Sequence, residues 1–460
     1  MKKFIYMAVA AIAVLSSCSS EDDYNDSPKD GGAFYATVED RGPRTTLGTG
    51  DDANKVFWSS GDKISVNGTE CTLTDGDGTT HATFEGGSVS GTPYKAYYPA
   101  SLYNGGTPTL PATQTYEEGT ISNLPMYAQS NDHNLVFKNL CGVLAITVNS
   151  SDFSSVSSIE ISSDQQMNGA FTATADGTLT FETKTLSADD KKVTLNFASA
   201  KTISSSETFY IAVPANAAHN FIIKVTGDSK TKAMATQAAS GISVVRNTVY
   251  PITFAENAVQ LWAGGPYWAT VNVGATIADY ASANGSTNAL KYTTANVGGL
   301  YRWCGTNNMR ESLTLGDDHY TGATYSSDYD TAKKLWGYNW QMPTSAQLTS
   351  LKNTTNCTWT YCSGSAGSQY VSGCTLAGWK VSGKTGTNYA SNSIFLPLAG
   401  YFSHNYPTSL RNEGAEEYYW SSTENGSTLA SRLYLTTSSQ DVNNQSSRSF
   451  GWSVRAILTE

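Results

Sequence analysis

Phosphate binding is the first chemistry that the sequence suggests. Residues Gly378 to Thr385 satisfy the P-loop pattern, in which backbone amides and a lysine cradle phosphate groups. A P-loop also needs a buried strand before the pattern and a helix after it. The residues that follow, Gly386 to Tyr389, are poor helix formers, so we interpret the match as chance.

The sequence contains no motif that indicates a metal site or a hydrolase active site. Its histidines are scattered, without the short spacing that places two ligands on one metal ion. They are His81, His133, His219, His319 and His404. No Gly-x-Ser-x-Gly motif marks a serine nucleophile. Asp317, Asp318, Asp328 and Asp330 could contact a cation, but acidic loops are usually just solvated. We therefore predict no catalytic residue, no metal site and no cofactor.

Cysteine chemistry is predicted at Cys18. A basic and apolar leader precedes this residue, and its apolar stretch is shorter than the ~20 residues that span a bilayer, so residues 1–17 are predicted to be a signal peptide. The four residues Leu15 to Cys18 resemble the lipobox of bacterial lipoproteins. The resemblance implies that Cys18 is lipidated and anchors the protein in the cell outer membrane, since two or more acyl chains hold a protein there stably.

Residues 18–32 form an acidic and polar linker. Its tract Ser19 to Asp23 resembles the surface-export signal of Bacteroidetes lipoproteins, which implies a surface-exposed protein; a merely solvated linker is the alternative. Export would permit disulfides among the remaining cysteines. The candidates for a bridge are Cys357, Cys362 and Cys374, which lie close together in the sequence.

The amino-acid composition limits the possible fold classes and partners of the chain. The chain has 460 residues, of which 29 are basic and 39 acidic, and it lacks a basic tract, which argues against nucleic acid as a partner. Only 15% of the residues are charged, while Ser, Thr, Gly, Asn and Tyr are abundant, so we predict a mainly β chain. Of ten tryptophans only Trp58 precedes residue 256, which predicts two domains, at residues 33–255 and 256–460.

The first predicted domain has the pattern of an antiparallel β-sandwich, with short alternating runs such as Val193 to Phe197 between turns rich in Gly, Asn, Asp and Ser. An ordered series of segments resembles the fimbrillin family of Bacteroidetes pilus proteins, which implies a transthyretin-like sandwich. The segments are Arg44 to Leu47, Trp58 to Val66, Tyr97 to Ala100, Leu135 to Leu140, Met167 to Phe171 and Phe209 to Pro214.

This resemblance implies assembly into a pilus by strand donation. Pilins of this family are exported as lipoproteins and then cut after an arginine, which removes a first strand and opens a groove for a strand of another pilin. Arg44 is the candidate cut site, and Arg41 is the nearby alternative. The candidate removable strand is the alternating segment Phe34, Tyr35, Ala36, Thr37 and Val38. Alternatively, Arg44 is simply an exposed loop residue and this strand stays in place.

The second predicted domain resembles the Fibrobacter succinogenes major paralogous domain, whose relatives look like variants of the C-type lectin fold. The resemblance implies an α+β fold. The segments that carry it are Tyr267 to Ala275, Leu335 to Thr344, Ile394 to Tyr401, Tyr419 to Thr423 and Gly451 to Ala456. Independently, the sequence predicts helices at Asp330 to Trp336 and at Thr344 to Lys352, the second with Thr344 as its N-cap.

A glycan or a protein could be the ligand of this lectin-like domain. The sequence contains neither a Glu-Pro-Asn nor a Gln-Pro-Asp tripeptide, so calcium-mediated sugar binding is not supported. Aromatic residues could line a sugar platform, but large rings normally build cores. We predict core positions for Trp336, Trp340, Trp420 and Trp452.

Three hypotheses remain. The first is a pilus tip subunit, because Val454 to Leu458 belong to the closing motif of the second domain and would not be free for donation to another pilin. The second is a lipid-anchored surface binding protein that does not polymerise. The third is an enzyme of the formylglycine-generating type, a class that shares the lectin-like fold and uses a cysteine pair. It is disfavoured, because the catalytic cysteine pair could come only from Cys304 and the three cysteines of the candidate bridge.

Overall fold

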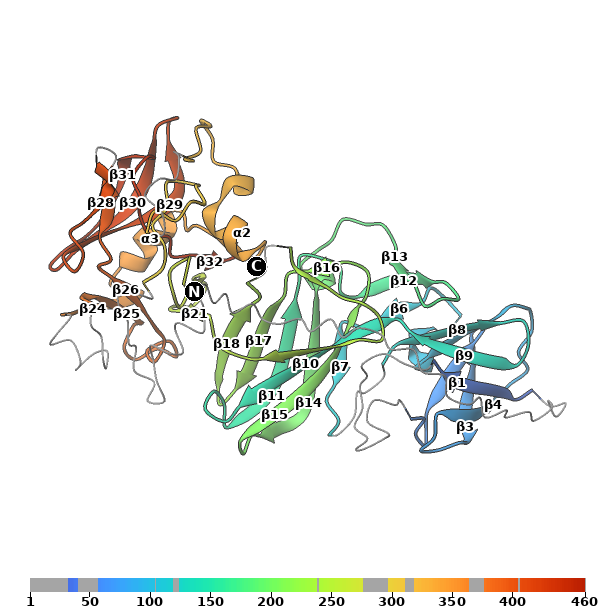
Figure 1. Ribbon diagram of the computed structural model, residues 1–460. Coiled ribbons are helices and arrows are strands. Elements are labelled where there is room, and N and C mark those ends of the chain that lie inside the picture. Colours follow the sequence, from blue (N-terminus) through green and yellow to red (C-terminus); the bar gives the residue numbers. More distant parts are fainter. Residues whose placement is uncertain are drawn as a thin grey trace, which may run out of the picture.

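The computed structural model describes residues 32–39, 57–103, 105–118, 124–237, 240–275, 297–310, 318–363, 376–403 and 406–459. Within these ranges the chain is mainly β, as the sequence predicts. Figure 1 shows three bodies in a row, which we call the barrel (blue to teal), the two-sheet body (teal to green) and the C-terminal region (yellow to red). The predicted first domain therefore contains two bodies, because alternation reveals strands but not which strands pair.

The barrel is a seven-stranded sheet closed on itself in the order β1-β4-β3-β2-β5-β8-β9. Its strands are β1 (Phe34–Val38), β2 (Lys63–Val66), β3 (Thr69–Asp75), β4 (His81–Gly86), β5 (Tyr94–Tyr98), β8 (Met126–Ser130) and β9 (Asn134–Asn139). Inward side chains gather around Trp58, whose ring centroid lies 5.0 Å from that of Phe84 and 5.5 Å from that of Phe137. Because side chains alternate between the inside and the outside along each strand, the apolar residues at every second position fill the interior of the barrel.

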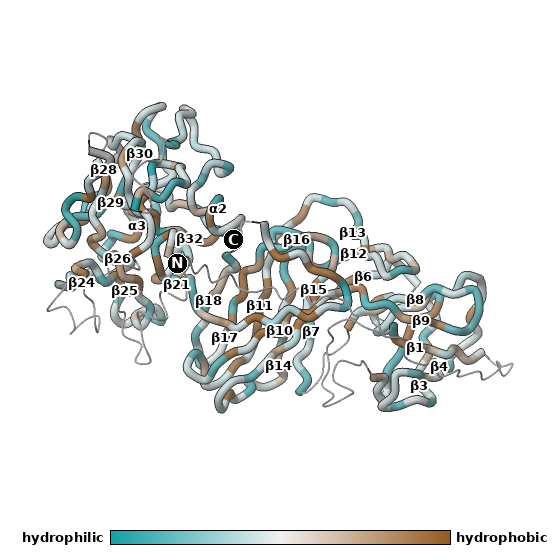
Figure 2. The backbone as a smooth tube through the Cα atoms, viewed as in Figure 1, coloured by the Kyte–Doolittle hydropathy of each residue, from teal (hydrophilic) through white to brown (hydrophobic). Residues whose placement is uncertain are grey.

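The two-sheet body holds one apolar core between two facing sheets. The first sheet contains β10 (Cys141–Asn149), β15 (Ser206–Pro214) and β20 (Val249–Thr253). The facing sheet contains β7 (Thr113–Thr115), β11 (Ser155–Ser162), β14 (Lys192–Thr202), β17 (Ile222–Gly227) and β18 (Lys230–Ala235). Smaller pieces are β6 (Thr109–Leu110), β12 (Gly169–Ala173), β13 (Leu179–Phe181), β16 (Ala218–His219) and β19 (Ile242–Ser243). Figure 2 shows hydrophobic segments along the strands of this body.

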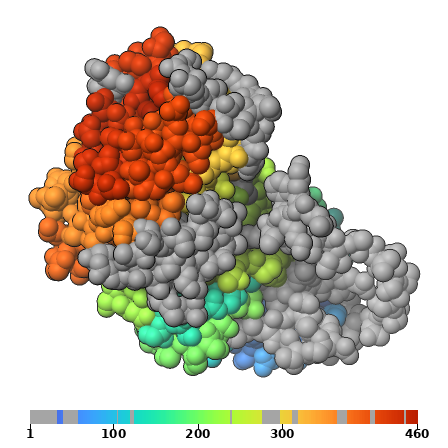
Figure 3. All heavy atoms as spheres, turned by 60° about the vertical axis from the view of Figure 1, so that its left-hand side comes forward, coloured from blue at the N-terminus to red at the C-terminus, as the bar shows by residue number. Residues whose placement is uncertain are grey.

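The sheet of β11 and β17 does not stop at the predicted boundary between residues 255 and 256. It continues through β21 (Ala258–Gln260), β22 (Tyr267–Ala269), β32 (Ile457–Leu458) and β23 (Trp340–Gln341), which gives nine strands in all. The buried amide of Asn257 extends the pairing, since its Oδ1 accepts from the Ala235 N–H at 2.9 Å and its Nδ2 donates to the Ala235 carbonyl at 2.8 Å. One shared sheet therefore joins the two-sheet body to the C-terminal region. Figure 3 shows the atoms of the C-terminal region (orange and red) above those of the two-sheet body (green).

The C-terminal region contains short helices and small antiparallel sheets. Helix α2 (Thr331–Trp336) is capped by Asp330, and helix α3 (Ser345–Lys352) is capped by Thr344 in a capping box with Gln347. Both predicted helices are confirmed to within one residue. The strands are β24 (Cys357–Cys362), β25 (Gly378–Gly383), β26 (Ser393–Pro397), β27 (Tyr401–Ser403), β28 (Tyr406–Arg411), β29 (Glu416–Asn425), β30 (Leu429–Thr436) and β31 (Gln440–Ser447). No helix in the described ranges is both long and apolar enough to cross a membrane.

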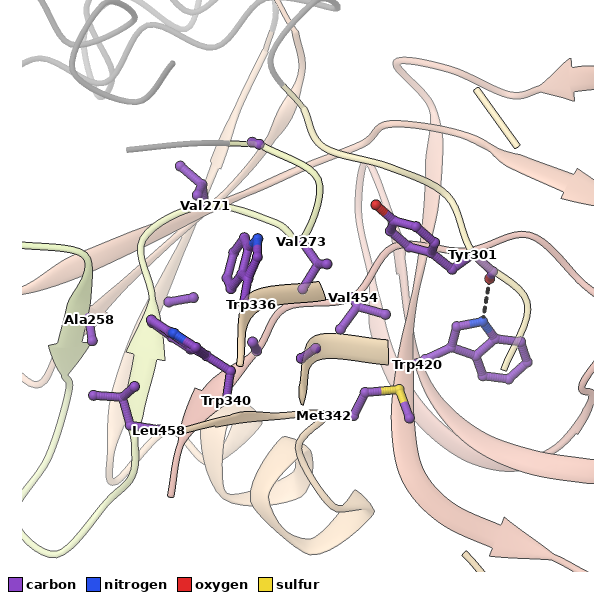
Figure 4. Packing of buried hydrophobic residues seen from close by; sticks show 14 of the residues in the cluster. Ala258, Val271, Val273, Tyr301, Trp336, Trp340, Met342, Trp420, Val454 and Leu458 are labelled. Carbon is purple, nitrogen blue, oxygen red and sulfur yellow. Dashed lines mark hydrogen bonds between the residues drawn. The ribbon is translucent and has the colours of Figure 1, made fainter. Parts of the chain in front are cut away.

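The tryptophans of the C-terminal region build its core, as predicted. Trp336, Trp340, Trp420 and Trp452 are at most 6% exposed. Figure 4 shows Trp336 and Trp340 packed among aliphatic side chains, with the Trp420 indole donating a 2.8 Å hydrogen bond to the Tyr301 carbonyl. These four rings are therefore not available as a sugar platform.

The P-loop pattern has no phosphate-binding structure. Its first six residues are strand β25, and turns rather than a helix follow Lys384. The interpretation of the match as chance is confirmed, because the helix that would direct its N-terminus at a phosphate does not exist at this position.

Candidate functional site at strand β1

Strand β1, the candidate removable strand, closes the barrel. It pairs antiparallel with β4, where Phe34 lies opposite Phe84, and parallel with β9, where Ala36 lies opposite Leu135. In Figure 1, β1 (dark blue) lies between β9 and β4. Since β1 is hydrogen-bonded on both sides, taking it away would leave two unpaired strand edges.

The side chains of β1 alternate between the core and the surface. Phe34 and Ala36 are each 1% exposed, whereas Tyr35 and Thr37 are half-buried on the outer face. The Phe34 ring packs edge-on against Tyr94, with the centroids 5.1 Å apart. Phe34 and Ala36 thus fill an apolar slot in the wall of the barrel, and the backbone edges of β4 and β9 form its sides.

Glu39, the residue after β1, ends the strand in a partly buried ion pair. Its backbone N–H donates to the Phe137 carbonyl at 2.9 Å, which continues the pairing with β9. One guanidinium nitrogen of Arg246 donates to both carboxylate oxygens of Glu39, at 2.5 and 2.7 Å. The Asn139 backbone N–H donates to the same carboxylate at 2.8 Å, and the Lys138 ammonium lies 3.6 Å from it. The Glu39 side chain is 7% exposed.

We call the groups that hold this carboxylate the Glu39 socket: the side chains of Arg246 and Lys138 and the backbone N–H of Asn139. Lys138 and Asn139 end strand β9 of the barrel, whereas Arg246 lies between β19 and β20 of the two-sheet body. Charge-assisted hydrogen bonds are about twice as strong as neutral ones. Glu39 therefore joins β1 to the barrel and also to the two-sheet body.

Close packing fixes the position of the socket. Asn247 adopts a positive φ of 56°, and its backbone N–H donates to the Cys141 carbonyl at 2.8 Å, which turns the chain at Arg246. A Cβ at Gly177, whose φ is also positive, would come within 2.8 Å of the Lys138 Cβ and 3.4 Å of the Arg246 Cδ. A side chain at position 177 would push both cations, so glycine lets three segments meet here.

Residues Val454 to Leu458 are integrated into the C-terminal region. All five are at most 4% exposed, and β32 pairs with β22 on one side and β23 on the other. The Arg455 guanidinium donates to Asn272 Oδ1 at 2.8 Å and to the carbonyls of Ala269 and Phe395 at 2.9 and 2.7 Å. This segment could be released only by opening the core.

The remaining sequence candidates fall into two groups. Cys18, Arg41, Arg44 and Cys374 lie outside the described residues. Cys357 and Cys362 are both buried, at the two ends of β24. Since a strand rises ~3.3 Å per residue and bridged Cα atoms lie at most ~7 Å apart, these two cysteines cannot be bridged to each other.

The acidic cation candidates stabilise loops and a helix instead. Asp318 accepts the backbone N–H groups of Thr306 and Asn307 at 2.7 and 2.9 Å, and Asp330 caps α2. Asp328 is exposed, and Asp317 lies outside the described residues. Nowhere in the described part of the chain do three or more His, Cys, Asp or Glu residues gather as metal ligands would.

Sequence reasoning missed the Glu39 socket. The only local signal was an acidic residue directly after an alternating apolar segment. Arg246 lies 207 residues further along the chain, and no spacing rule connects the two.

Comparison with known proteins gives structural likenesses only. No protein family and no curated protein matches the sequence. The structure is similar to a Bacteroides uniformis protein named "putative cell adhesion protein", with 19% identity over 50% of this chain and 94% of that chain and a TM-score of 0.31. A fimbrial protein from Bacteroides ovatus is 10% identical over 93% of this chain and 99% of that chain, with a TM-score of 0.24. The tip fimbrial protein Mfa3 from Porphyromonas gingivalis is 10% identical over 49% of this chain and 96% of that chain, with a TM-score of 0.21.

Proposed function

We propose that this chain is a surface subunit of a pilus that is matured by proteolysis and accepts a strand of a neighbouring subunit in place of β1. The observation that carries the proposal is the position of β1, which comes first among the described strands and is bonded on both edges. Its loss would expose the backbone of β4 and β9 beside an apolar slot. Unpaired strand edges of this kind recruit a strand from another chain.

The cut is proposed at Arg44, with Arg41 as the alternative. Both lie between β1 and Trp58, in the segment that connects β1 to the rest of the barrel. A cut in this segment separates β1 from β2 and divides none of the described strands. Before the cut, a lipidated Cys18 would hold the chain on the outer membrane, at the cell surface.

A tip position is proposed for the subunit. The segment Val454 to Leu458 is buried and paired on both sides, so it can serve no other chain as a donated strand. A subunit that accepts a strand through the barrel and keeps this segment in its own core suits the end of a filament. The C-terminal region, for which we propose a C-type-lectin-like fold, would then meet a glycan or protein target.

A second candidate function is a lipid-anchored surface protein that does not polymerise and keeps β1. The ion pair of Glu39 with Arg246 favours this alternative, because it strengthens the attachment of β1. The enzyme hypothesis finds no comparable support. Burial raises the pKa of the Cys357 thiol to about 12 and also raises that of the Cys304 thiol, so neither is a ready thiolate at neutral pH.

Substitution of the candidate cut sites in the native cell tests the proposal. With Arg41→Ala and Arg44→Ala combined, the protein should stay on membranes and disappear from sheared surface filaments. Lys63→Ala, a change of a half-exposed barrel cation outside the cut segment, serves as the control and should leave the distribution unchanged. An unchanged amount of the double variant in filaments would contradict proteolytic maturation at these arginines.

A further inference from the structure

We propose that the Glu39 socket selects the strand that replaces β1, and that this strand must carry a carboxylate at the position of Glu39. The inference rests on the proposed replacement of β1 and names the chemistry of its partner. In β1, Phe34 and Ala36 are buried, Val38 packs against the core, and the acid follows directly. The partner strand is therefore expected to read apolar-x-apolar-x-apolar-acid.

The charges of the socket make the acid necessary. Two cations, Arg246 and Lys138, face a single carboxylate, and the Asn139 N–H has that carboxylate as its acceptor. Asn139 is 1% exposed. A replacement strand that excludes water again but has no acceptor at the position of Glu39 would therefore leave the Asn139 N–H unpaired. A buried donor or charge without a partner is costly, whereas a carboxylate restores every contact.

The geometry also fixes direction and register. Because β1 runs parallel to β9, Glu39 reaches the end of β9, where Lys138 and Asn139 lie. A strand in the same direction brings its acid to the socket only when its apolar residues take the places of Phe34 and Ala36. A slip of one residue would turn those apolar side chains outward and also move the acid away. The apolar slot and the socket thus require the same register of the replacement strand.

Peptide exchange on the nicked full-length chain tests this inference. The chain is cut after Arg44 by an arginine-specific protease, mass spectrometry confirms the nick, and a labelled peptide of residues 33–39 competes with the resident strand. A matched peptide with Glu39→Gln should bind about 10- to 100-fold more weakly, since Arg246 and Lys138 are only partly buried. A Tyr35→Phe peptide, changed on the outer face, should bind as the wild-type peptide does.

A protein variant separates a direct contact from a general effect of charge. In Arg246→Met, the difference in affinity between the wild-type and Glu39→Gln peptides should shrink several-fold, because the main partner of the carboxylate is gone. If Arg246→Met fails to fold, Arg246→Lys gives the second test, since it keeps the charge but loses the guanidinium nitrogen that donates to both oxygens, and the difference in affinity should again shrink. Lys201→Met, in strand β14 and ion-paired with Glu118 rather than with Glu39, is the control and should keep the full difference.

The outcomes distinguish this inference from the proposed function. Equal binding of both peptides would overturn the role of the socket and leave strand replacement standing. If neither peptide binds and the resident β1 cannot be displaced, strand replacement itself fails, and the inference fails with it.

Discussion

Truncation of Phe34 to alanine should open the barrel while the rest of the protein stays folded. Phe34 is 1% exposed, packs against Tyr94 and His133 with ring centroids 5.1 and 4.8 Å away, and lies in the strand that closes the sheet. Removal of a buried phenyl ring costs about 3–5 kcal/mol. If the barrel opens as a unit, its amides should exchange with solvent roughly 100- to several-thousand-fold faster.

Hydrogen exchange read by mass spectrometry is the assay, because it resolves the bodies from one another. Peptides from β4 and β9 should lose protection in the Phe34→Ala variant, whereas peptides from β11 and β17 should keep it. Tyr35→Ala is the matched control: it also removes an aromatic ring from β1 but from the outer face, and should cost less than about 1 kcal/mol. Unchanged protection of β4 and β9 in Phe34→Ala would refute the claim that β1 holds the barrel closed.

Two further predictions concern the C-terminal region, followed by tryptophan fluorescence in urea. Burial raises the pKa of Glu417 from its ordinary value of 4.5 to about 8. Between these two pH values the folded state keeps a proton that the unfolded state loses. The free energy of unfolding should therefore fall as pH rises from 4.5 to 8, by up to about 5 kcal/mol. Glu417→Gln should remove this share of the pH dependence, and equal slopes in both proteins would count against it. Arg455→Lys should cost about 2–4 kcal/mol, because the single nitrogen of a lysine cannot reach all three acceptors that the guanidinium bonds from three separate nitrogens, at a site that is 1% exposed. Lys384→Arg, on an exposed turn, should change stability by less than about 0.5 kcal/mol, and an equal loss in both variants would contradict the role of Arg455.

Local structure could be predicted from the sequence because its causes are local. Thr344 follows a proline and precedes Gln347 by three residues, and this spacing is enough to form the capping box that begins α3. The turn before β2 is also local: the Asp62 carboxylate accepts the Ser59 N–H at 2.8 Å.

Pairing between distant segments could not be predicted in the same way. Alternation in Phe34 to Val38 shows that the strand has one buried face, but it does not reveal that β9, a hundred residues away, is its parallel partner. The distribution of tryptophans suggested a boundary at residue 256, yet hydrogen bonds carry one sheet across it. The ion pair of Glu39 and Arg246 depends on the pairing of β1 with β9 and on the position of the segment between β19 and β20, so it became visible only in the structure.

The central claim is that β1 is removed and replaced. It is tested most directly by the mass of the N-terminal peptide of this protein in sheared surface filaments and in membranes of the native cell. We predict an N-terminus at Thr45 in filaments, which would leave the slot between β4 and β9 to a strand of another subunit. A lipidated Cys18 found only in membranes would contradict the claim and would mean that β1 stays in the barrel of a monomeric surface lipoprotein.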